Sequence, residues 1–333
     1  MNRPFFASVG VLAALALVAP ASGAGQTGKA WSPPRTSDGQ PDLQGVWDFR
    51  TITPLERPDI FAGKEVLTDE EVADVEEQKA RFDAADPKDR RNVNPGFSTS
   101  RNLTDRVDEQ AYNSFWFDNG TKVIPTRRTS LIVDPRDGRI PYAPAGRARA
   151  TQRRGTDGPE DRGLTERCIL SLNAGPPLRP SAYNNNIQIV QAPGYVAILN
   201  EMIHDVRVIP LDGRRHIGPQ IRQWRGDSRG RWDGTTLVVE TTNFSEKTNF
   251  SGSTEDVRVM ERFTRAGPET LNYEFTVSDP KSYARPWTAA FPMTKTGERI
   301  FEYACHEGNY GMTNLLSGAR AQEKAAEAAG RKR

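Results

Sequence analysis

Residues 204–244 read HDVRVIPLDGRRHIGPQIRQWRGDSRGRWDGTTLVVETTNF and hold the pattern that decides the fold. Two Asp-Gly pairs, at 212–213 and 233–234, interrupt runs that are rich in Val, Ile, Leu and Thr. An Asp-Gly pair between such runs is a strong signal for a β-hairpin, because glycine adopts positive φ without steric cost. The stretch therefore predicts two hairpins, one over 206–219 and the other over 231–241.

The alternation of apolar and polar residues continues on both sides of this stretch. Val257, Val259, Glu261 and Phe263 share one parity, so they would line one face of a strand. Successive strands joined by tight turns favour an antiparallel meander. We expect a mainly β protein whose meander forms a calycin-like barrel, with a β-sandwich as the alternative. Further candidate strands cover 43–49, 115–117, 129–133, 187–191, 195–199, 271–277, 287–291 and 300–304.

Two helices are predicted outside the sheet. Thr68 and Glu71 form a capping box, and apolar residues follow at helical spacing, which predicts a helix near 69–84. A polar, alanine-rich run predicts a C-terminal helix near 317–329. Loop insertions are expected in the irregular segments near 85–112 and 143–186.

Residues 1–24 are organised as a secretory signal peptide. Arg3 precedes an uncharged apolar run of 16 residues, and small residues end the segment at Ala24. This run is shorter than the roughly 20 residues that a bilayer requires, so we expect no stable membrane insertion. The mature protein is therefore expected in the bacterial periplasm or outside the cell. It would comprise a lead-in at 25–41, a single β-rich domain at 42–316 and a polar tail at 317–333.

The charge balance excludes one class of partner. The 333-residue chain has a formal net charge of +2, which falls to +1 when the segment containing Arg3 is removed. Such a balance gives no electrostatic case for nucleic acid. The expected partner is a small organic ligand, and the sequence leaves the oligomeric state open.

The chain has two cysteines, Cys168 and Cys305. In an exported protein a single possible pair indicates a disulfide, which would close a loop of 137 residues. Such a loop is worth about 4–5 kcal/mol in the chain-entropy model. The alternative is a nucleophilic Cys305 beside His306. An oxidising compartment argues against that alternative.

The three histidines are the candidate catalytic groups. His204, His216 and His306 are far apart in the sequence and show no metal-ligand spacing, so we expect neither a metal nor a cofactor. A histidine can act as general acid or base without metal, or it can be structural. The chain also contains no nucleophile elbow, phosphate-binding loop or dinucleotide fingerprint.

Arginine and tryptophan residues gather on the predicted hairpins. Arginine can bind the carboxylate of a ligand beside an aromatic wall, and a barrel mouth is a usual place for such a site. The alternative is that Arg–Asp pairs only tie the hairpins together. The candidate ligand-binding residues are Glu201, Arg207, Trp224, Arg231, Trp232, Arg285, Trp287, Glu307 and Tyr310.

Five blocks of the sequence form specific motifs: SLIVDPRDGRIP at 130–141, Arg167-Cys168, GDSRGRWDGTTLVV at 226–239, ERFT at 261–264 and EYACHEGNY at 302–310. Together they resemble a large family of exported bacterial proteins that has no assigned activity. The resemblance implies export and no particular reaction. Gly45-Val46-Trp47 also resembles the Gly-x-Trp signature of calycin barrels, which include carriers of apolar molecules and a few enzymes.

Three functions follow from these patterns. The first is extracytoplasmic binding of a small, partly apolar organic molecule in a β-barrel pocket. The second is a lyase, isomerase or hydrolase that uses a histidine as general acid or base, with Arg and Trp positioning the substrate. The third is a structural or interaction protein of the cell envelope. A convergence of two histidines with a carboxylate would favour the enzyme, and a closed apolar cavity would favour the carrier.

Overall fold

The computed structural model describes residues 31–85, 118, 120–152, 155–171, 173–248 and 250–330. The expected signal peptide, the candidate strand at 115–117 and nearly all of the loop at 85–112 lie outside these residues. Residues 32–333 form one structural unit, distinct from residues 1–31. The part of the lead-in that is described folds back through a turn, with Arg35 bridged to Pro41.

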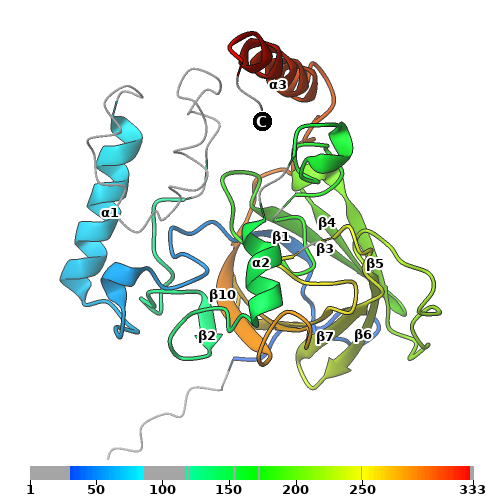
Figure 1. Ribbon diagram of the computed structural model, residues 1–333. Coiled ribbons are helices and arrows are strands. Elements are labelled where there is room, and N and C mark those ends of the chain that lie inside the picture. The colour runs from blue at the N-terminus through cyan, green and yellow to red at the C-terminus, as the bar shows by residue number, and fades with distance from the viewer. Residues whose placement is uncertain are drawn as a thin grey trace, which may run out of the picture. The chain divides into compact units, whose positions relative to one another are not determined.

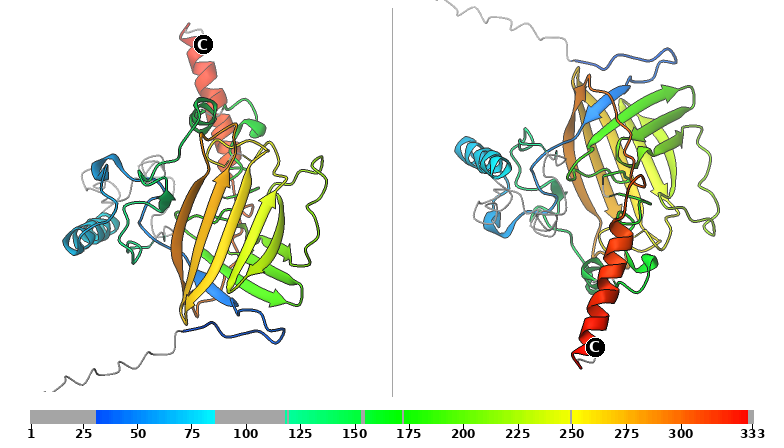
Figure 2. Two further views of the ribbon diagram at one scale, coloured as in Figure 1. Left: turned by 90° about the horizontal axis from the view of Figure 1, so that it is seen from below. Right: turned by 90° about the horizontal axis from the view of Figure 1, so that it is seen from above.

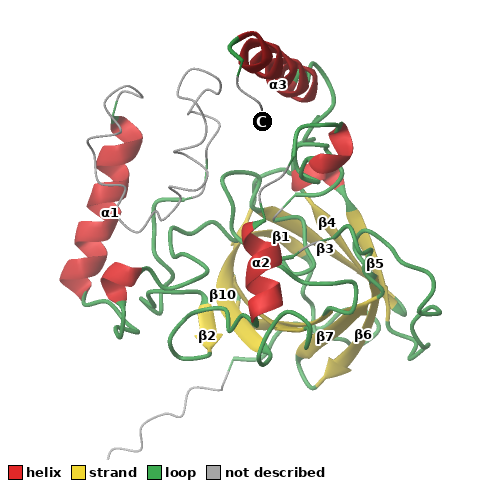
Figure 3. Cartoon of the chain, viewed as in Figure 1, coloured by secondary structure: helices red, strands yellow, loops and turns green. Residues whose placement is uncertain are grey.

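Ten strands form one antiparallel sheet (Figures 1 and 3), which confirms the mainly β prediction. Nine of them follow the order β5-β4-β3-β1-β10-β9-β8-β7-β6, and β2 pairs with β10. The strands are β1 (Gly45–Asp48), β2 (Ile132–Asp134), β3 (Asn186–Ala192), β4 (Tyr195–Asn200), β5 (Val206–Pro210), β6 (Asp227–Asp233), β7 (Thr236–Thr242), β8 (Arg258–Gly267), β9 (Thr270–Ser278) and β10 (Trp287–Thr296).

The predicted meander is present in two runs. Strands β6 to β10 lie side by side in chain order (Figure 2), and β3 to β5 form a second run. Strand β1 joins the two runs, since Trp47 pairs with Ile187 on one side and with Lys295 on the other. The predicted turn at 233–234 connects β6 to β7, and Gly234 there has φ +61°.

The sheet is not closed into a barrel. Its end strands are β5 and β6, and no ladder joins them in the described part of the chain. They nevertheless meet at Gly230, where an added Cβ would lie 2.6 Å from Leu211 Cδ2 and 2.8 Å from Ile209 Cγ2. Because Gly230 has no side chain, Ile209 on β5 and Leu211, directly after β5, pack on the backbone of β6.

Three α-helices accompany the sheet. Helix α1 (Asp69–Ala84) has the predicted bounds and the predicted capping box between Thr68 and Glu71. Helix α3 (Gly311–Ala328) begins six residues before the predicted start at 317. Helix α2 (Pro144–Thr151) lies in the segment that was expected to be irregular. It was missed because Arg147 and Arg149 interrupt any apolar stripe.

The predicted hairpin over 206–219 is wrong. Strand β5 pairs with β4, and no strand follows it until β6. The intervening loop is held by Asn243, whose Nδ2 donates to the carbonyls of Ile217, Gly218 and Ile221 at 3.2, 3.0 and 3.1 Å. The amide of Asn243, directly after β7, thus forms hydrogen bonds with backbone carbonyls that the partner strand of a hairpin would otherwise bind.

Two other strand predictions changed. Residues 300–304 form no strand, and Phe301 is 68% exposed. Strand β10 has no free edge for them, because β9 lies on one side and β1 and β2 on the other. Of the predicted strand at 129–133, only residues 132 and 133 belong to a strand, as part of β2.

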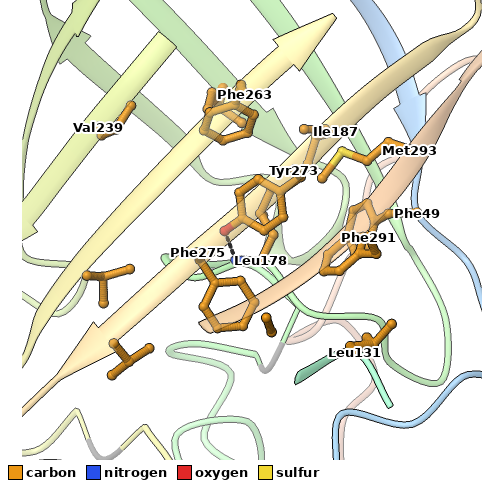
Figure 4. Packing of buried hydrophobic residues seen from close by; sticks show 14 of the residues in the cluster. Phe49, Leu131, Leu178, Ile187, Val239, Phe263, Tyr273, Phe275, Phe291 and Met293 are labelled. Atoms are coloured by element: carbon orange, nitrogen blue, oxygen red, sulfur yellow. Dashed lines mark hydrogen bonds between the residues drawn. The ribbon is translucent and has the colours of Figure 1, made fainter. Parts of the chain in front are cut away.

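The interior of the sheet is filled by its own side chains. Trp47, Phe263, Tyr273 and Trp287 are fully buried, and the rings of Phe263 and Tyr273 lie 4.9 Å apart. Figure 4 shows Tyr273 at the centre of this packing, between side chains from the two sheet runs. In the described part of the chain, packed side chains therefore fill the space where the carrier hypothesis placed a ligand pocket inside a barrel.

A buried ion pair links the end strand β5 to β8, an interior strand of the other run. Arg207 on β5 donates to both oxygens of Glu261 on β8, with Nη2 to Oε1 at 3.0 Å. Tyr273 donates to Glu261 Oε1 at 2.8 Å and accepts from the backbone N–H of Leu178 at 2.8 Å. Burial opposes the charge on Arg207, but the Glu261 carboxylate outweighs it and raises the arginine pKa.

Candidate functional site at the open seam

A cavity of about 760 Å³ opens where β5 and β6 diverge. We call it the seam cavity. The two strands touch at Gly230 and separate toward Val206 on β5 and Asp227 on β6. Its apolar lining consists of Ile169, Leu170, Val206, Val208 and Trp224, and its cationic lining consists of Arg207, Arg222, Arg225 and Lys247. The volume suits a small organic ligand.

The edge of β5 presents backbone groups to this cavity. Asn200 N donates to Asp205 O at 2.9 Å, and Leu211 N donates to Gly194 O at 2.8 Å. Because bonded and non-bonded pairs alternate in an antiparallel ladder, Val206 and Val208 direct their N–H and C=O groups away from β4. Their side chains are 51% and 57% exposed, so both polar and apolar groups of this strand are accessible.

Arg225 is a largely buried cation of the cavity, and unlike the more deeply buried Arg207 it is not held by a two-pronged pair with a carboxylate. Its Nη1 donates to the carbonyls of Ala174 and Gly175 at 2.5 and 3.2 Å, and its Nε contacts Asp205. Its Nη2 is buried and has no hydrogen-bond partner in the described structure. Burial lowers the pKa of Arg225 to about 10. The guanidinium is thus held in place with one donor nitrogen unused.

A histidine–carboxylate pair adjoins the cavity. His216 Nδ1 lies 2.8 Å from Asp227 Oδ2, and its Nε2 lies 4.0 Å from Glu240 Oε2. Asp227 also accepts from the backbone N–H of Ile217 at 3.1 Å and from Arg229 at 2.6 Å. Asp227 lines the cavity, so the side chain of His216 contacts the cavity lining through this pair.

The other two histidines lie elsewhere. His204 is exposed and ends a 3-10 turn, Met202–His204, with φ +41°, and it does not line the cavity. His306 is exposed in the segment after β10. Among the described residues neither imidazole has a side-chain partner, and no group of three His, Cys, Asp or Glu residues has the arrangement of a metal site.

The predicted ligand-binding residues divide into two groups. Arg207 and Trp224 line the seam cavity, as expected for a ligand site. Glu201 is buried, and its carboxylate accepts hydrogen bonds from Asn186 Nδ2 at 2.8 Å and from the backbone N–H of Phe301 at 3.2 Å. The remaining predicted residues do not line the cavity: Arg231, Arg285, Glu307 and Tyr310 are exposed, Trp232 packs against the core and Trp287 lies within it.

The sequence interpretation missed Arg222, Arg225 and Lys247. All three lie in or directly after the opening stretch, and the density of arginine there was the available signal. No sequence pattern indicated that β5 and β6 diverge. This divergence is what makes residues 222–228 face the edge of β5. Arg–Asp pairs also connect segments of the chain, as the alternative interpretation of these arginines predicted. Arg225 contacts Asp205, and Arg262 bonds Asp233 at 3.1 Å.

The disulfide between Cys168 and Cys305 is present, as predicted. It excludes a free nucleophilic thiol at Cys305. No described helix is both long and apolar enough to cross a bilayer. The chain matches no protein-family profile, no curated protein and no solved structure.

Proposed function

We propose that this protein binds a small, partly apolar organic anion in the seam cavity. The observation that carries the proposal is that Arg225 lines a cavity with an apolar wall and has, in Nη2, a buried donor without a hydrogen-bond partner in the described structure. Four cationic side chains line the cavity against two acidic ones, Asp205 and Asp227, and both acids already contact arginine. A carboxylate bound to Arg225 would satisfy the remaining donor, with the chain of the ligand on Val206, Val208 and Trp224.

The proposal includes export and a calycin-like origin of the open sheet. The disulfide supports export, because disulfides persist mainly in oxidising compartments. The calycin-like origin is supported by the antiparallel order of the strands and by Trp47, which is fully buried on β1 and donates to Leu43 O at 2.9 Å.

Octanoate titration tests the binding function. We expect saturable calorimetric binding of octanoate and weaker binding of 1-octanol, which lacks the charge. Arg225→Gln should weaken octanoate binding about 10–100-fold, the range expected for one hydrogen bond to a charged group. Trp224→Ala should weaken both probes, since it removes apolar wall area.

Arg231→Gln is the matched control. Arg231 lies on β6 and is exposed, but it does not line the cavity, so this variant should bind octanoate like the wild type. Equal binding by Arg225→Gln and Arg231→Gln would contradict the proposal, as would an absence of octanoate binding. Thermal melting of each variant shows that a loss of binding is not a loss of fold.

A second candidate function is hydrolysis at the same cavity, which the His216–Asp227 pair favours. Asp227 would orient the imidazole, and Nε2 would take a proton from water. In this case p-nitrophenyl octanoate should be hydrolysed at least about 100-fold faster by the wild type than by His216→Gln. Equal rates for the two proteins would leave binding as the only function of the cavity.

A further inference from the structure

The edge of β5 that faces the seam cavity is an unprotected strand edge. Val206 and Val208 turn their backbone N–H and C=O groups away from β4, and both residues line the cavity. Proteins usually block such an edge with a charged side chain or a proline. Here the exposed side chains are the two valines, and the charge between them, on Arg207, is buried in the pair with Glu261. The edge is therefore accessible to another strand.

This accessible edge is short. Pro210 is the next residue of β5 whose backbone faces away from β4, and proline has no N–H to donate. The seam also closes at this end, because Ile209 packs on Gly230. The two valines are separated by one residue and span about 7 Å along the strand, which matches about three residues of an added strand. A strand bound here is therefore a short one.

A cation of the cavity lies at the other end of this edge. Arg225 contacts Asp205, the residue directly before β5. An antiparallel strand added to β5 would begin beside Val208 and end beside Asp205, because antiparallel neighbours run in opposite directions. Its last residue would place a terminal carboxylate near Arg225, whose Nη2 has no hydrogen-bond partner in the described structure.

We propose that the anion of the seam cavity is the C-terminal carboxylate of a short extended peptide, which pairs with β5 as an added antiparallel strand. This inference rests on the proposed binding function and names its ligand class. An alkyl chain on β5 would remove water from the backbone groups of Val206 and Val208 without replacing its hydrogen bonds, which is unfavourable. A peptide replaces those bonds, and its side chains can contact the valines and Trp224.

The peptide N-acetyl-Val-Ala-Val with a free carboxylate tests this inference beside octanoate. Calorimetry should show tighter binding of the peptide acid than of octanoate. The C-terminal amide, which lacks the charge, should bind about 10–100-fold more weakly than the acid. Methylation of the second peptide nitrogen should weaken binding about 10-fold, because it removes the N–H that would donate to Val206 O. Methylation of the first nitrogen is the matched control and should cost less, because alternate N–H groups point away from β5.

The outcomes separate this inference from the binding function on which it rests. If octanoate binds but the peptide acid does not, the peptide inference is wrong and the proposed function stands. The same conclusion follows if the two methylated peptides bind equally, or if the acid and the amide do. Failure of octanoate and of the peptide acid together would refute the proposed function itself.

Val206→Pro tests the pairing from the side of the protein. Proline removes the Val206 N–H, which faces away from β4, and Asp205 before it has the extended conformation that suits a following proline, with φ −88° and ψ 139°. Val206→Ala is the matched control, because it loses the valine side chain but keeps the N–H. The ratio of peptide affinity to octanoate affinity should fall about 3–10-fold further in Val206→Pro than in Val206→Ala.

Equal ratios in the two variants would contradict the added strand. Thermal melting shows whether each variant is folded. If Val206→Pro does not fold, the methylated peptides decide the question on the wild type alone.

Discussion

Glu261→Gln should lower the free energy of unfolding by about 3–5 kcal/mol, the range for breaking one partner of a buried ion pair. Glu261 is fully buried, and Arg207 is 7% exposed, so the substitution leaves a guanidinium charge without a counter-ion or water. The loss should be larger than for a surface pair such as Arg262 and Asp233, where solvent screens the charges. Urea unfolding of the purified protein measures it.

A double substitution separates charge from packing. Arg207→Met with Glu261→Leu removes both charges and should be clearly more stable than Glu261→Gln alone, because no charge remains buried. Tyr273→Phe is the milder companion, since it removes one hydroxyl that bonds Glu261 and the Leu178 N–H. Its expected cost is about 1–3 kcal/mol. If the two single losses at Arg207 and Glu261 simply add in the double variant, the two side chains do not interact as described.

Replacing both cysteines with serine should lower the free energy of unfolding by about 4–5 kcal/mol, because the unfolded chain regains the entropy of a 137-residue loop. Few other described bonds hold the segment around Cys305. Asn309 Nδ2 donates back to Cys305 O at 3.0 Å, within the segment itself. Segment 297–310 should therefore become the first site of proteolysis when the disulfide is absent.

The control for this prediction is the reduced wild type. Treatment with dithiothreitol should reproduce both the lower urea midpoint and the new cleavage in segment 297–310. A loss below about 1 kcal/mol in the serine variant would mean that the disulfide closes a loop that is already ordered in the unfolded state.

Local patterns predicted the elements whose partners lie close in sequence. The capping box of Thr68 and Glu71 indicated the start of α1, and the parity of 257–263 identified four buried side chains, three of them on β8 and Val257 directly before it. Both rest on interactions within one element or between adjacent strands. Glu261 shows the limit of this reasoning: its parity was correct, but its partner Arg207 lies 54 residues away on β5.

The position of the candidate site is set by contacts between residues that are far apart in the sequence. Trp224 and Arg207 were identified by residue type and do line the seam cavity, whereas Trp287 was identified on the same ground and lies in the core. Nothing in the local sequence distinguishes these tryptophans. The cavity exists because the loop from Leu211 to Gly226 forms no strand, and Asn243 holds part of that loop from the end of β7.

A crystal structure of the protein with octanoate tests the central claim most directly. The predicted result is electron density for the ligand in the seam cavity. Its carboxylate should lie within hydrogen-bond distance of Arg225 Nη2, and its chain should lie against Val206, Val208 and Trp224. Octanoate bound elsewhere, with the seam cavity holding only solvent, would contradict the claim that this cavity is the ligand site.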